Sequence, residues 1–203
     1  MKNILVAIAL CAAGFAAYGQ GEVAFNNTSA TLISANGVPM PVSGTQRFYF
    51  AIFFASSTTV DTTSQTALFT DPAFQTARAY NTNSPTLPGR TLLYPHLDGG
   101  LGPGNAVDFV VRGWSASAGA TWAEALVTWN NGTPLTPMFI GSSVVGNNIT
   151  LGGGGLPVPT VFGPALVVGQ VPGFNMEFVP EPATLPILGL GAAGAWLFRR
   201  RTP

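Results

Sequence analysis

The sequence predicts an all-β protein: a single β-sandwich or jelly-roll-like domain with one short helix. Glycine (25) and proline (17) together make up about a fifth of the 203 residues and recur between short apolar runs. This pattern is typical of many short strands joined by tight turns. Only one segment of the body combines a helix cap with helical spacing. Outside the domain we expect an N-terminal signal helix and a C-terminal transmembrane helix.

The N-terminal segment has the pattern of a secretory signal. Lys2 precedes an apolar run over residues 4–17, and small residues then occupy the two positions that a signal peptidase reads. We therefore predict a signal peptide over residues 1–19. Its removal takes away Cys11, the chain's one cysteine, so we expect neither a disulfide nor a cysteine-ligated metal in the mature protein.

The predicted extracytoplasmic domain, residues 20–178, carries few charges and is acidic. It has four arginines, no lysine and seven carboxylates, a net charge of −3. Nucleic-acid binding would require a basic face. We therefore expect no nucleic-acid partner, although the whole chain is formally neutral.

Apolar runs bounded by turn residues predict the strands in chain order. They lie at 22–26, 31–33, 47–55, 91–94, 106–114, 139–140, 144–145, 148–151, 165–168 and 174–179. The run at 47–55 is rich in aromatic residues and has no helix cap, so we expect it to be buried on both faces. Asn36-Gly37 is a strong turn dipeptide.

The strand predicted at 106–114 alternates clearly. Val107, Phe109 and Val111 fall on one face, and Asp108, Val110 and Arg112 fall on the other. Because Asp108 and Arg112 project from the same side, we expect them to face one another.

The predicted helix begins at a capping box, Thr121-Trp122-Ala123-Glu124, in which each side chain bonds the other residue's backbone amide. Trp122, Ala125, Leu126 and Trp129 follow at helical spacing, and Asn-Asn-Gly at 130–132 ends the helix. This stripe is expected to belong to the core.

Three residues of the body are candidates for contact with a glycan. Trp114 offers an aromatic face, while Asp98 and Asp108 lie within seventeen residues of it and could converge with it at one sandwich edge. Core packing explains Trp114 equally well, and we expect it to be buried. The loop at 98–105 could bind calcium, but it lacks alternating acidic ligands, so a plain turn is favoured.

We predict no catalytic residue, no metal site and no cofactor. His96 is the only histidine, too few for a nitrogen-rich metal site, and the nearest approach to a serine-nucleophile elbow, at 113–117, lacks its last glycine. Asp98, Asp108 and Glu124 are the carboxylates that glycoside hydrolysis could use, but structural roles are favoured for them.

The C-terminal segment, residues 179–203, has three parts: Val-Pro-Glu-Pro-Ala-Thr, an apolar stretch and a cluster of arginines. The uncharged stretch at 183–198 would form a helix of roughly 24 Å, short for a hydrocarbon core of about 30 Å. Arg199, Arg200 and Arg201 follow it directly and predict a cytoplasmic end that anchors the segment. Lys2 also stays cytoplasmic, so the body faces outward.

This arrangement resembles the PEP-CTERM sorting signal of Gram-negative bacteria. The resemblance implies that an exosortase-type enzyme recognises Pro180, Glu181 and Pro182. It also implies that the protein is held by its C-terminus before processing and then reaches the cell surface or extracellular matrix. The resemblance covers only about the last 25 residues.

A second, weaker resemblance concerns the body. The residues after the signal, 20–27, and the stretch at 109–124 look like exported proteins of unknown function from Verrucomicrobia and their relatives. Two functions stay open. The protein is a structural or interaction protein of the surface or matrix without enzymatic activity, or it is a carbohydrate-binding module or glycan-active enzyme that contacts extracellular polysaccharide.

Overall fold

The computed structural model describes residues 21–44, 46–56, 74, 76–92, 97–98, 101–131, 138–164 and 167–179. The predicted signal helix at 1–19 and the predicted transmembrane segment lie outside the described residues. Within the described ranges, no helix has both the length and the apolarity to cross a membrane.

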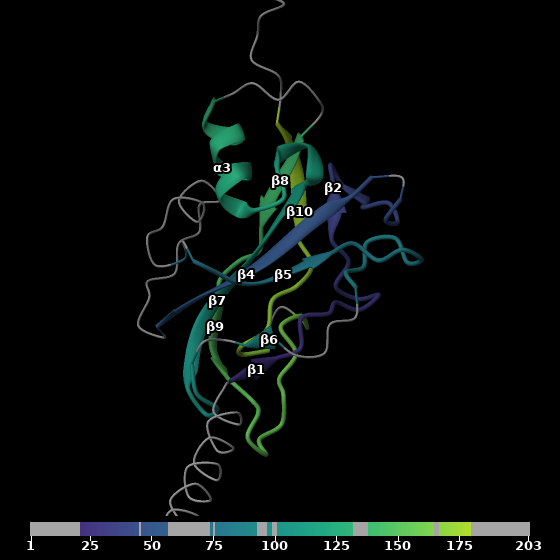
Figure 1. The fold of residues 1–203 in the computed structure, drawn as a ribbon. Helices are drawn as coiled ribbons and strands as arrows, with labels where there is room; N and C mark the ends of the chain where they lie inside the picture. Colours follow the sequence, from purple (N-terminus) through teal and green to yellow (C-terminus); the bar gives the residue numbers. More distant parts are fainter. Residues whose placement is uncertain are drawn as a thin grey trace, which may run out of the picture.

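The described chain is mostly β-sheet with one short α-helix, which confirms the all-β prediction (Figure 1). The main sheet has eight strands in the order β3-β2-β10-β8-β7-β4-β5, with β9 also paired to β7. Their bounds are β2 Ser34–Ala35, β3 Val38–Pro39, β4 Phe48–Ser56, β5 Ala77–Thr82, β7 Ala106–Ser115, β8 Met138–Ser142, β9 Gly146–Thr150 and β10 Asn175–Val179. A second sheet pairs β1 (Glu22–Val23) with β6 (Leu97–Asp98).

The antiparallel pair β4–β7 lies inside the main sheet and is buried on both faces. Its register runs from Phe48 opposite Ser115 to Ser56 opposite Val107. Phe50, Phe109 and their same-face neighbours enter one core, while alternate residues such as Phe53 and Val110 enter another. Two-sided burial was predicted for β4, and the alternation predicted for β7 is confirmed.

Different segments of the chain pack over the two cores. The first core is closed by apolar residues near the N-terminus and by the segment at 151–171. The second is closed by Phe74, by the 3₁₀ turn η2 (Ala116–Ala118) and by the helix α3 (Trp122–Asn131). The main sheet is therefore a middle layer with no face left fully to solvent.

Two predicted strands are displaced or not formed among the described residues. The strand expected at 31–33 is displaced to 34–35, because Thr31 belongs to a turn in which its Oγ1 accepts from the Thr28 amide at 2.8 Å. Asn36 and Gly37, with φ of 53° and 79°, form the expected turn, and the structure shows that it is a two-residue hairpin turn between β2 and β3. At 91–94, Thr91 makes only an isolated bridge to Asn83, and residues 93–94 are outside the described ranges.

Two further corrections concern residues 144–145 and 165–168. Val144 and Val145 lie between β8 and β9, which both pair with β7. Ser143 bridges the break, since its amide donates to the Val111 carbonyl and its Oγ accepts from the Val111 amide. Val167 is in a turn, with its amide bonded to the Pro164 carbonyl at 3.0 Å; residues 165–166 are not described.

The predicted capping box is confirmed at the start of α3. The Thr121 hydroxyl accepts from the Glu124 amide at 3.3 Å, and the Glu124 carboxylate accepts from the amides of Thr121 and Ala120 at 3.2 and 2.7 Å. Trp122 and Ala125 are buried, and Leu126 and Trp129 pack against the same core. The helix forms where local capping and an apolar stripe agree.

We expect Thr121→Ala to lower the free energy of unfolding by about 1 kcal/mol, because the Glu124 amide loses its acceptor at the helix start. Chemical denaturation measures the change. Thr121→Ser is the matched control, since serine caps equally well, and it should stay close to the wild type. Equal destabilisation by both substitutions would contradict this role for the hydroxyl.

Candidate functional site

Trp114, the predicted glycan-contact residue, is fully buried in the second core. Its ring centroid lies 5.6 Å from that of Trp122, 6.1 Å from that of Tyr49 and 6.2 Å from that of Tyr80. Its indole Nε1 donates to the Gly119 carbonyl at 2.9 Å. The expected burial is confirmed, and the indole presents no face on which a sugar could stack.

Arg112 is also buried beside this aromatic cluster. Its guanidinium carbon lies 4.3 Å from the ring centroid of Phe53 and 4.6 Å from that of Trp122. Its Nη1 donates to the Phe74 carbonyl at 2.8 Å. A guanidinium stacks well on aromatic faces because it is planar and weakly hydrated. The arginine therefore ties β7 to the helix layer.

The outer side of the same cluster is a surface that we call the tyrosine face: Arg47, Tyr49 and Tyr80. Tyr80 on β5 is 45% exposed and meets Trp114 edge-on. Tyr49 on β4 is half-buried, and the guanidinium carbon of Arg47 lies 5.7 Å from its ring centroid. Two phenol rings beside a cation form a surface that can accept a polyhydroxylated ligand by stacking and hydrogen bonding.

The tyrosine face was not predicted from the sequence, although β5 carries a local signal for it. In β5, Arg78 and Tyr80 are exposed while Ala79 and Asn81 are buried, a period of two. Residues 77–82 contain too few apolar side chains to be predicted as a strand. The proximity of Tyr80 to Tyr49 depends on the pairing of β4 with β5, which no local pattern specifies.

The two predicted acidic contacts are not brought to Trp114. Asp108 lies six residues from Trp114 along β7, which corresponds to roughly 20 Å. Its buried carboxylate accepts from the Asn148 amide at 2.8 Å. Asp98 is in β6, opposite Glu22 in the second sheet. Convergence of these three residues at one edge is therefore absent from the structure.

The expected approach of Asp108 to Arg112 is wrong. Their Cα atoms are four residues apart on one strand, about 13 Å, and the Asp108 carboxylate bonds to β9. His96 lies outside the described residues. Among the residues that are described, no three potential metal-ligating side chains gather at one point.

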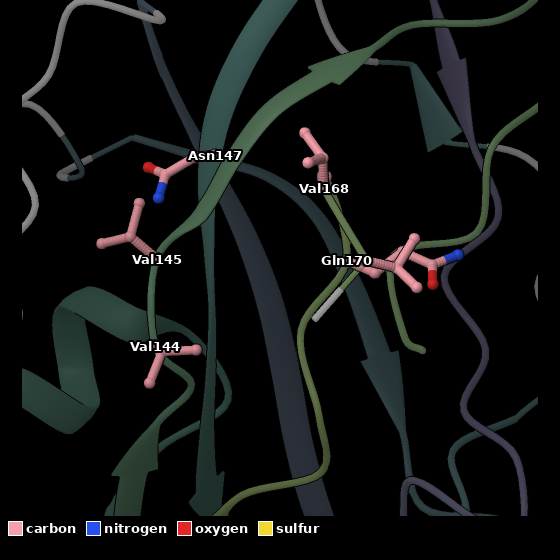
Figure 2. Close-up of a pocket in the computed structure, with 7 residues that line it drawn as sticks. Val144, Val145, Asn147, Val168 and Gln170 are labelled. Carbon is pink, nitrogen blue, oxygen red and sulfur yellow. The ribbon is translucent and has the colours of Figure 1, made fainter. Parts of the chain in front are cut away.

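A shallow pocket of about 340 Å³ lies between the connection from β8 to β9 and the turn at 167–170 (Figure 2). It is lined by Val144, Val145, Asn147, Val167, Val168, Gly169 and Gln170. The Gln170 amide donates to Thr160 Oγ1 at 2.7 Å. None of these seven lining residues is titratable, so this set offers no group for acid–base or nucleophilic chemistry.

The body joins the C-terminal segment without an intervening linker. β10 is an interior strand, parallel to β2 and antiparallel to β8, with Val179 opposite Met138. Pro180, Glu181 and Pro182 follow directly in the sequence. These three residues and Arg199, Arg200 and Arg201 lie outside the described residues. The proposed recognition motif thus begins where an interior strand of the sheet ends.

Residues 178–201 match the family model of the PEP-CTERM protein-sorting motif. No curated protein and no solved structure matches the chain. The C-terminal signal is therefore supported by similarity. The resemblance of the body to exported proteins of Verrucomicrobia finds no support in these comparisons.

We expect Trp114→Ala to destabilise the protein by about 3–5 kcal/mol, because a fully buried indole and its hydrogen bond are lost. Tyr80→Ala, a matched aromatic truncation on the exposed side, should cost only about 1 kcal/mol. Urea denaturation of both variants measures the difference. Near-wild-type stability of Trp114→Ala would contradict its placement in the core.

Proposed function

We propose that the chain is an exported structural or interaction protein, and that an exosortase-type enzyme sorts it through its C-terminal signal to the cell surface or extracellular matrix. The match of residues 178–201 to the PEP-CTERM motif carries this proposal. The apolar residues 183–198 and the arginines after them supply the membrane segment that such sorting needs. Signal peptidase is the second processing partner, acting after residue 19.

The β-rich body then serves display rather than catalysis. Two of the carboxylates considered for glycoside chemistry make contacts that support the fold. Asp108 accepts from the Asn148 amide, and Glu124 caps α3. A carboxylate pair for hydrolysis needs two groups facing a common space about 5–10 Å wide. Asp108 is instead buried within the sheet, which supports a structural role.

We expect Glu181→Gln to leave a larger, membrane-bound precursor in the native host, because the change removes the charge from the Pro-Glu-Pro motif while keeping its shape. Glu177→Gln is the matched control: Glu177 is exposed on β10, four residues upstream, and outside the matched segment. Immunoblots of membrane and released fractions measure processing. Equal processing of both variants would refute recognition through Glu181.

Polysaccharide binding at the tyrosine face is the second candidate function. It is favoured by the exposure of Tyr80 beside Tyr49 and Arg47. Both rings pack against the buried ring of Trp114, which limits their motion, so less side-chain entropy is lost when a sugar stacks on them. The proposed destination supplies the ligand, since a matrix protein is surrounded by polysaccharide.

We expect Tyr80→Ala to weaken retention on the host's own polysaccharide about fivefold, which corresponds to the loss of roughly 1 kcal/mol of stacking. Affinity electrophoresis through a gel that contains the polysaccharide measures the change. Tyr80→Phe keeps the ring and should retain most of the binding. Wild-type protein that migrates equally with and without polysaccharide would exclude this second function.

A further inference from the structure

The spacing between β10 and the apolar segment limits how far the body can stand from a membrane. Val179 is fixed opposite Met138 in the sheet, and the uncharged stretch begins at Ala183. Four residues of extended chain span at most about 14 Å. While the C-terminal segment is in the bilayer, the end of β10 must therefore lie within roughly that distance of the apolar segment.

Three elements meet at this end of the molecule, which we call the exit pole. β10 ends there, β8 begins there, and α3 ends there (Figure 1). Phe178 is 42% exposed and its ring packs at 5.8 Å on that of Phe139. Trp129 and Asn131 lie in the last turn of α3, which carries no basic residue. Aromatic and uncharged polar side chains suit the interface between lipid headgroups and water, and one exposed carboxylate, Glu177, lies next to Phe178 on β10.

The opposite end of the molecule carries the N-terminal junction. β1 and β6 lie there, and the Glu22 amide donates to the Gly152 carbonyl at 3.0 Å (Figure 1). Leu156 is 48% exposed in the turn that follows Gly152. β7 starts on this side and runs about 33 Å towards the exit pole. The two predicted membrane segments thus attach at opposite ends of the folded body.

We propose that the exit pole rests on the outer surface of the lipid bilayer while the C-terminal segment holds the precursor, so that the β1–β6 end faces outward. This inference rests on the proposed function, in which residues 183–198 are membrane-embedded. The signal peptide must leave the membrane before the exit pole can settle, because the N-terminus is at the other end.

Site-specific labelling tests the orientation, because a single cysteine can be placed at either end. Full-length chains carry Cys11→Ala together with Asn131→Cys or Phe178→Cys at the exit pole, or Leu156→Cys at the outward end. They are exported in a Gram-negative strain without an exosortase. Spheroplasts, in which the outer surface of the cytoplasmic membrane is accessible, are then treated with polyethylene-glycol maleimide. The matched controls carry about twelve Gly-Ser residues between Val179 and Pro180, enough to lift the body off the bilayer.

We expect both exit-pole cysteines to react about tenfold more slowly than Leu156→Cys, because labelling follows the fraction of time for which a site is uncovered. The linker should raise their rates to that of Leu156→Cys. Equal rates without the linker, or slow rates that the linker leaves unchanged, would overturn the orientation. Recovery of the chain in the soluble fraction would instead overturn the membrane segment itself.

Discussion

Burial of the β4–β7 pair on both faces is the constraint on which the rest of the fold depends. Because alternate side chains of one strand enter two different cores, each core needs its own cover. The segment at 151–171 helps to cover one core, and α3 helps to cover the other. The helix is thus required in a chain made mostly of strands, since it closes the core that contains Trp114.

The features that could be predicted from the sequence are those whose signals are contained within about ten residues. The strands at 48–56 and 106–115, the Asn36-Gly37 hairpin and the capped helix all belong to this class. Pairing between distant segments could not be predicted. Asp108 bonds to Asn148, forty residues away, and that partner depends on how β9 aligns with β7. The face of the strand from which Asp108 projects could be predicted, but its partner Asn148 could not.

The candidate binding surface also combines a feature that is visible in the local sequence with one that depends on the pairing of distant strands. Trp114 was a candidate for glycan contact because its aromatic face is large, but tryptophan is also highly buried on average, and the core explains it here. Tyr80 lies in a polar strand and becomes significant only because β5 pairs with β4, which places it opposite Ala51 and diagonally across from Tyr49. The buried indole packs against both phenol rings. A buried structural residue and the surface proposed for recognition are therefore parts of one aromatic cluster.

The junction between the body and the sorting signal is set by the chemistry of proline. β10 is paired on both sides, so each of its residues contributes to a ladder until the strand stops at Val179. The pairing with β2 ends at Met176, so only the ladder with β8 reaches Val179, and Pro180 has no N–H with which to extend it. The residue that begins the Pro-Glu-Pro motif is thus one that cannot continue the sheet. The sorting motif therefore follows the last paired residue of the domain directly, with no linker residue between them.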